Sequence, residues 1–255
     1  MNISTRANVL TGDNLLIGGF IISGNDSKKV ILLAKGPSIS SGGIPVPGRM
    51  LDPTLELHAG DGSLITRNDD WTDSPERAQI EASGFAPTDN RESAIIRTLA
   101  PGPYTGILAG KGSASEIALI EIYDLEANKS VLGNISSRGR VDNGDNVMIG
   151  GFIAGNQSAN ARVLMRGIGP SLQGKVPGPL ADPILELHDS NGAQIATNDD
   201  WKDAPNRAEI EATGIPPGDD AESAILTTVT PSSYTAILRG KNGGGIAVVE
   251  IYNLR

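Results

Sequence analysis

The sequence predicts an all-β protein of two tandem jelly-roll-like β-sandwich domains, each with one short helix. Three observations favour this class. Short stretches alternate between apolar and polar residues, glycine and proline recur between these stretches, and the second half of the chain repeats the pattern of the first. The chain has 255 residues, with 32 glycines and 16 prolines, which suits many short strands joined by turns.

Eight strands are predicted in the first half from apolar runs bounded by turn signals. Apolar and polar residues alternate most clearly over 55–58 and 118–123. The dipeptides Asp61-Gly62 and Asn191-Gly192 are typical of hairpin turns. The predicted strands run over about 3–9, 15–23, 29–34, 54–58, 63–67, 93–99, 104–109 and 117–125, and the second half repeats them.

One short helix is predicted over about 75–82. Asp73 or Ser74 can cap it, because their side chains accept hydrogen bonds from backbone N–H groups. Pro75 suits its first turn and Gly84 suits its end. The same signals recur in the second half, at Asp203, Pro205 and Gly214.

The internal repeat spans a whole domain. The motif Asn-Ile-Ser-x-Arg occurs at 2–6 and 134–138, Ile-Gly-Gly-Phe-Ile at 17–21 and 149–153, and Asn-Asp-Asp-Trp at 68–71 and 198–201. Each half closes on Glu-Ile-Tyr, at 121–123 and 250–252. We therefore predict two domains, 1–127 and 128–255, which meet in the polar stretch 126–133.

Composition narrows the function classes. The net charge is −9 and no Lys/Arg run offsets it, which argues against nucleic-acid binding. The absence of cysteine excludes disulfides and thiolate metal sites. No apolar run is long enough to span a bilayer. No signal peptide is visible at the start of the sequence, so an exported protein would have lost its leader or carry it outside this sequence.

Several motifs resemble known modules. The run 52–58 (DPTLELH), the hairpin signal at 60–62, the Asn-Asp-Asp cluster and the late Pro-Gly-Pro-Tyr resemble pre-peptidase C-terminal-type β-sandwich domains. The second half departs from this pattern, with Pro231-Ser232-Ser233 before Tyr234. Almost the whole chain is similar to tandem NISTR…GGFI…NDDW modules of large secreted bacterial proteins. The resemblance implies a non-catalytic domain, an extracellular or cell-surface location, and binding of calcium or polymers.

Each half carries a cluster of acidic and amide side chains near the predicted helix. Calcium takes six to eight oxygen ligands, and such a loop offers several. The alternative is structural: these residues cap the helix and form Asx-turns. The candidate calcium ligands are Asn68, Asp69, Asp70, Asp73 and Asp89 in the first half, and Asn198, Asp199, Asp200, Asp203 and Asp219 in the second.

Aromatic and histidine side chains give weaker signals. Trp71 and Trp201 each follow Asn-Asp-Asp. If exposed, they form a ligand platform for a sugar ring; burial at the edge of the core is the favoured interpretation. The only histidines, His58 and His188, each end an alternating strand beside a hairpin. We expect them to brace the turn rather than to bind a metal.

No nucleophile, base and orienting group can be assembled from these motifs, so we expect no enzyme. The expected function is that of an extracellular structural or interaction protein, stabilised by calcium. Because the chain ends coincide with the domain ends, chains are expected to self-associate head-to-tail into filaments or a surface layer. The alternative is a carbohydrate-binding module pair with a glycan partner.

Overall fold

The computed structural model describes residues 3–111, 116–126, 131–142, 144, 146–154 and 160–254. The chain divides into two compact units, Met1–Gly133 and Asn134–Arg255. The predicted domain boundary between residues 127 and 128 lies outside the described residues. Within the described part, no helix has both the length and the apolar character needed to cross a membrane.

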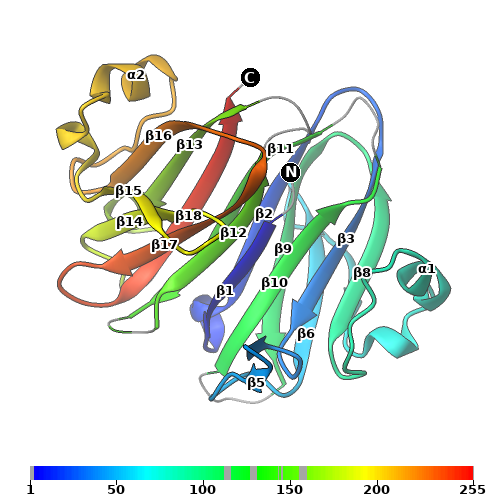
Figure 1. Cartoon of the computed structure of the whole chain (residues 1–255). Coiled ribbons are helices and arrows are strands. Elements are labelled where there is room, and N and C mark those ends of the chain that lie inside the picture. The colour runs from blue at the N-terminus through cyan, green and yellow to red at the C-terminus, as the bar shows by residue number, and fades with distance from the viewer. Residues whose placement is uncertain are drawn as a thin grey trace. The chain divides into compact units, whose positions relative to one another are not determined.

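The first unit contains two antiparallel sheets of four strands each (Figure 1). One has the order β1-β10-β3-β8 and the other β2-β9-β6-β7. Consecutive strands of the sandwich alternate between the two sheets, except that β6 and β7 form a hairpin within one sheet, as in a jelly roll. The strands are β1 (Ile3–Val9), β2 (Leu16–Ser23), β3 (Lys28–Lys35), β6 (Pro53–Ala59), β7 (Leu64–Asn68), β8 (Ser93–Leu99), β9 (Gly102–Gly110) and β10 (Glu116–Asp124).

The second unit has the same topology. Its sheets have the orders β11-β18-β13-β16 and β12-β17-β14-β15. The prediction of two all-β jelly-roll sandwiches, each with one short α-helix, is therefore confirmed. The strands are β11 (Val131–Val141), β12 (Met148–Ala154), β13 (Ala161–Ile168), β14 (Pro183–His188), β15 (Gln194–Asn198), β16 (Ser223–Val229), β17 (Ser232–Gly240) and β18 (Gly245–Leu254).

The main core of the first unit lies between its two sheets. Gly106 on β9 faces Leu32 and Ile120 on the opposite sheet. A Cβ at Gly106 would lie 2.9 Å from the Leu32 side chain and 3.2 Å from that of Ile120. Glycine at this position therefore lets the two sheets approach closely.

A second, smaller core lies on the other face of β3. Ile31 and Leu33 pack there against Trp71 and Ile80, which belong to the turn η2 (Trp71–Asp73) and the helix α1 (Arg77–Ala82). Because both faces of β3 are covered, this strand is an uninterrupted apolar run instead of an alternating one. Figure 1 shows α1 beside β8, and the equivalent α2 (Arg207–Ala212) beside β16.

The helix is shorter than predicted. It begins at Arg77 instead of Pro75, and the Ser74 hydroxyl accepts a hydrogen bond from the N–H of Glu76 just before it. Gly84 follows the helix with a φ of 75°, a left-handed conformation that glycine adopts without steric cost. The predicted cap is therefore wrong: Glu76 is the N-cap residue and has no side-chain cap bond, while Asp73 and Ser74 belong to the preceding turn.

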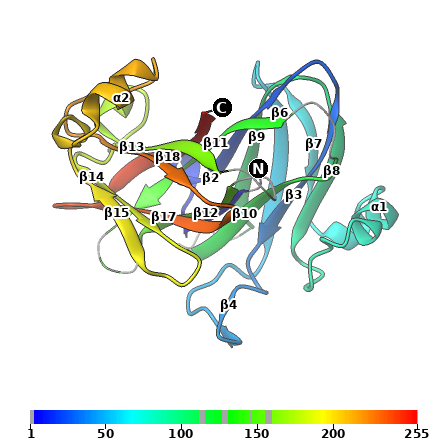
Figure 2. The same cartoon turned by 45° about the horizontal axis from the view of Figure 1, so that its top comes forward.

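The first unit also has a hairpin that was not predicted, β4 (Ser40–Ser41) with β5 (Ile44–Pro45). It extends away from the sandwich in Figure 2. The corresponding connection of the second unit contains the 3-10 turn η3 (Pro170–Leu172). Strands of two residues are too short to show an alternating pattern in the sequence.

Candidate functional site

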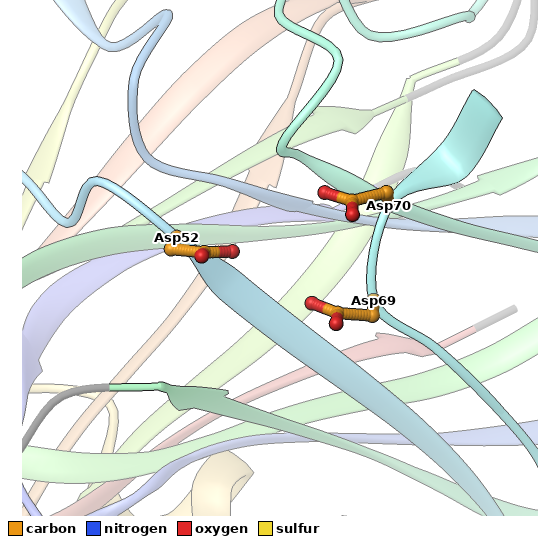
Figure 3. Close-up of side chains that lie close together, drawn as sticks. All are labelled: Asp52, Asp69 and Asp70. Carbon is orange, nitrogen blue, oxygen red and sulfur yellow. The ribbon is translucent and has the colours of Figure 1, made fainter. Parts of the chain in front are cut away.

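Three carboxylates meet where β6 begins and β7 ends. Asp52 directly precedes β6, while Asp69 and Asp70 directly follow β7, which pairs with β6. Each contributes an oxygen within 4.8 Å of the others, and Figure 3 shows the three side chains pointing into a common space. The second unit builds the same cluster from Asp182, Asp199 and Asp200. We call these clusters the Asp triads.

A lysine lies against each Asp triad. The Lys111 ammonium is 3.2 Å from an Asp52 oxygen and 2.8 Å from an Asp69 oxygen. The bond to Asp69 is the main reason why the pKa of Lys111 is raised to about 12. In the second unit, Lys241 contacts the equivalent aspartates and its pKa is also raised.

One lysine does not neutralise three carboxylates. Burial, and then the neighbouring Asp69 charge, raise the pKa of Asp70 in the first triad. In the second triad, burial and the charge of Asp199 raise the pKa of Asp182. Buried oxygens of Asp52 and Asp69 also have no hydrogen-bond donor among the described residues. Each triad therefore carries excess negative charge that a cation would stabilise.

The other predicted ligands lie outside the triads, and several of them form structural bonds instead. The Asn68 carbonyl oxygen accepts a bond from the N–H of Ala94, and its amide donates to the Asp70 carbonyl. The Asp89 carboxylate pairs with Arg91, which holds the pKa of Asp89 below its usual value. Asn198, Asp203 and Asp219 are likewise outside the second triad, as is Asp73 outside the first.

Two members of each cluster were not predicted from the sequence. They are the aspartate before β6 or β14 and the lysine, that is, Asp52 and Lys111 in the first unit and Asp182 and Lys241 in the second. They are distant along the chain from the Asn-Asp-Asp motif. A signal was nevertheless present, because Asp-Pro recurs as Asp52-Pro53 and Asp182-Pro183, and Gly-Lys recurs at 110–111 and 240–241. Residues that recur at equivalent positions of a duplicated domain are candidates for one site.

The tryptophans do not form an exposed platform. Trp71 is 7% exposed and Trp201 is 5% exposed. Their indole N–H groups donate to the carbonyl oxygens of Asp89 and Asp219, and Arg77 lies over the Trp71 ring. The proposed ligand platform is therefore wrong, and the burial interpretation describes both side chains.

Each histidine braces a hairpin turn. His58 Nδ1 is 3.0 Å from the Gly62 carbonyl oxygen, and Nε2 is 2.8 Å from a Glu56 carboxylate oxygen. Both partners only accept hydrogen bonds, so the doubly protonated ring satisfies both. The Gly62 and Glu56 bonds raise the pKa of His58. At His188, burial lowers the pKa, but the bonds to Glu186 and Gly192 outweigh this effect, so the pKa of His188 is raised as well.

Replacing both histidines by glutamine should produce a pH-dependent loss of stability. A raised folded pKa stabilises the protein fully below the unfolded pKa of about 6.5, and this contribution is lost as the pH rises through the folded pKa. The difference in Tm between wild type and the His58→Gln/His188→Gln variant should therefore be larger at about pH 5.5 than at about pH 8. A difference that does not change with pH would contradict the bracing role of the imidazolium.

Comparisons with known proteins give only distant likenesses. No protein-family model and no curated protein sequence matches the chain. The structure entitled "Crystal Structure of the STIV MCP" is 12% identical with a TM-score of 0.25, over 98% of this chain and 95% of that one. A structure of Sulfolobus Turreted Icosahedral Virus is 10% identical with a TM-score of 0.25, over 99% and 88%. The major capsid protein of bacteriophage PM2 is 9% identical with a TM-score of 0.25, over 99% and 98%. At these TM-scores the likenesses carry no argument about what the chain does.

Proposed function

We propose that the chain is a non-catalytic structural protein of the cell exterior that self-associates and is stabilised by calcium. The exterior location is supported by the resemblance to secreted tandem modules and by the acidic, cysteine-free composition. Self-association is supported by exposed apolar side chains that recur at equivalent positions of both units. Calcium binding is supported by the Asp triads.

The recurring apolar side chains carry the proposal. Ile21 on β2 and its equivalent Ile153 on β12 are 40% and 51% exposed. Ile65 on β7 and its equivalent Ile195 on β15 are 39% and 51% exposed. The exposed part of these side chains adds nothing to the stability of a monomer, and its recurrence in both copies supports a contact surface.

Strands β7 and β15 suit pairing with another chain. Each is the last strand in its sheet order and has five residues. A strand at the edge of a sheet presents unpaired N–H and C=O groups that a second chain can bind. Neither strand contains the lysine or proline that commonly blocks such pairing. We therefore assign the contact between copies to these two strands.

Replacing Ile65 and Ile195 by threonine should weaken self-association. Wild type is expected to show a mass that rises with concentration in sedimentation velocity, and filaments or sheets in electron microscopy. The Ile65→Thr/Ile195→Thr variant should need roughly tenfold or more higher concentration to assemble, since about 1.4 kcal/mol of apolar contact corresponds to a tenfold change. Both replaced positions are exposed, so the circular dichroism spectrum should not change.

The matched control is Ile44→Thr. Ile44 is 72% exposed, but it lies on the β4–β5 hairpin of the first unit. Its replacement removes more exposed apolar surface than either single replacement in the test variant and leaves the recurring positions unchanged, so assembly should match wild type. A wild type that remains monomeric at every concentration, with and without calcium, would overturn the assembly proposal. Equal assembly of wild type and the Ile65→Thr/Ile195→Thr variant would overturn the assignment to β7 and β15.

The Asp triads support the calcium part of the proposal. Each offers three carboxylate oxygens, and calcium would draw its remaining ligands from backbone carbonyls and water. The lysine ammonium would have to leave as the ion enters, because both occupy the same negative field. Calcium should therefore raise the Tm in proportion to the logarithm of its concentration, once the free ion exceeds its dissociation constant.

The Asp70→Asn/Asp182→Asn variant tests this expectation. Asp70 and Asp182 have raised folded pKa values, so ionisation of these groups costs stability at neutral pH. Without calcium, the variant should melt at the same temperature as wild type or a few degrees higher. With millimolar calcium, wild type should gain Tm while the variant does not. A wild type that shows no shift, or a variant that shows the full shift, would contradict calcium binding by the triads.

A further inference from the structure

A pocket of about 470 Å³ lies in the first unit, between the edge strands β7 and β8. Residues of β6, β7 and β8 form its walls. The segment 69–76, which contains the turn η2 and leads into α1, covers one side. Pro75 is its exposed apolar residue, Leu55 and Ile95 beneath it are buried, and the other groups around it are mainly polar. A volume of this size falls within the range of small-molecule sites.

The charged groups of the pocket are held in place. The Arg97 guanidinium is 2.7 Å from a Glu76 oxygen, and also donates to the Ile96 carbonyl and the Thr66 hydroxyl. The Ser74 hydroxyl in turn donates to the other Glu76 oxygen, 3.1 Å away. This network orients donors and acceptors without any ligand, which lowers the entropy cost of binding.

The second unit lacks this network although it keeps the same fold. The positions of Arg97, Glu76 and Ser74 are occupied in the second unit by Thr227, Asn206 and Ala204. Further pocket positions also lose polar groups: Thr54, Thr66 and Arg67 become Ile184, Ala196 and Thr197. The Asp triad residues, by contrast, are identical in the two units. The polar lining is therefore not required for folding, and is specific to the first unit.

The mixture of charges selects the class of ligand. Five carboxylates, of which Asp69 and Asp70 also belong to the Asp triad, and two guanidinium groups line the pocket, so an anionic ligand would be repelled when calcium is absent. A cationic ligand would be repelled by the guanidinium groups of Arg67 and Arg97, and would have to compete with Arg97 for the Glu76 carboxylate. Hydroxyl groups both donate to carboxylates and accept from guanidinium groups, and a sugar ring also has an apolar C–H face that can pack on Pro75.

We propose that this pocket of the first unit binds a neutral sugar residue, while the equivalent place in the second unit does not. The pocket has no aromatic lining residue. The affinity for a single sugar is therefore expected to be in the millimolar range, where polar contacts to a solvated ligand usually lie. Binding of this kind becomes useful when many copies act together on one polymer.

The test is an NMR titration of the full chain with a panel of neutral mono- and disaccharides. At least one sugar should shift the backbone amide signals of residues 54–56, 66–76 and 94–97, and leave those of 184–186, 196–206 and 224–227 unchanged. The variant Arg67→Thr/Glu76→Asn/Arg97→Thr installs the residues of the second unit and should weaken binding by roughly tenfold or more. Thr66→Ala, which leaves the Arg97–Glu76 ion pair intact, should weaken it less and guards against misfolding of the triple variant.

The same titration distinguishes the alternatives. Inorganic phosphate and a lysine derivative with a blocked carboxylate serve as anionic and cationic probes. Stronger shifts from either probe than from every sugar would overturn the proposal. It would equally be overturned by shifts of the same size in both units, by a folded triple variant that binds as wild type does, or by no shifts with any saccharide.

Discussion

Replacing Lys28 with alanine should lower the free energy of unfolding of the first unit by about 3 kcal/mol, the lower end of the cost of removing one partner of a buried ion pair, because the Asp124 side chain is 18% exposed. The Lys28 side chain is 1% exposed. Its ammonium lies 2.8 and 2.7 Å from the two Asp124 carboxylate oxygens and 2.7 Å from the Glu126 carbonyl oxygen. Alanine removes all three bonds and leaves the charge of Asp124 without its ammonium. The Tm of this unit should fall by about 10 °C.

The second unit supplies the control for this change. Ala161 and Asn253 occupy the positions of Lys28 and Asp124 there, in strands of the same topology. The double variant Lys28→Ala/Asp124→Asn should therefore regain much of the stability that Lys28→Ala loses, because the carboxylate charge that loses the Lys28 ammonium is removed as well. Lys29→Ala removes a neighbouring lysine whose bond to Gln79 is exposed, and should cost less than about 1 kcal/mol. A Lys28→Ala variant as stable as Lys29→Ala, measured by urea unfolding, would contradict the buried pair.

The strands were predictable because the local sequence of most of them shows either alternating apolar residues or a continuous apolar run. In β6, Leu55 and Leu57 are fully buried while Glu56 and His58 between them are not, as the alternating pattern predicts. The run around Ile31 and Leu33 does not alternate, and only the packing of α1 on the outer face explains why. No local sequence pattern indicates which distant strands pair, and this pairing is what makes the fold a jelly roll.

The candidate sites were harder to predict, because they depend on contacts between distant segments. Asp69 and Asp70 were expected to share a site, but their partners Asp52 and Lys111 come from other strand ends. The local motif suggested Asn68 as a fourth ligand, yet its side chain bonds the backbone of β8. The burial of Lys28 could not be anticipated either, since a lysine at a strand end is ordinarily exposed.

Two buried glutamates hold equivalent loops but have different hydrogen bonds. Glu222 is fully buried and one of its oxygens accepts from the N–H groups of Gly169 and Ser171. Its other oxygen accepts from the Ser171 hydroxyl and the N–H groups of Gly218 and Asp219. In the first unit, one oxygen of Glu92 accepts from the N–H groups of Gly36 and Ser38 and from the Ser38 hydroxyl, in the equivalent loop. Its other oxygen has no hydrogen-bond partner among the described residues.

Glu222→Gln should therefore destabilise its unit more than Glu92→Gln destabilises the other. At Glu222, either orientation of the amide places an NH₂ group against N–H donors, and the lost bonds should cost about 2–4 kcal/mol. At Glu92, the amide oxygen can keep the bonds to Gly36 and Ser38 while the NH₂ group occupies the side without donors, so the cost should be about half as large. Urea unfolding of the two single variants measures both costs. Equal losses would show that the charge of the carboxylate, rather than the number of donors it satisfies, stabilises these loops.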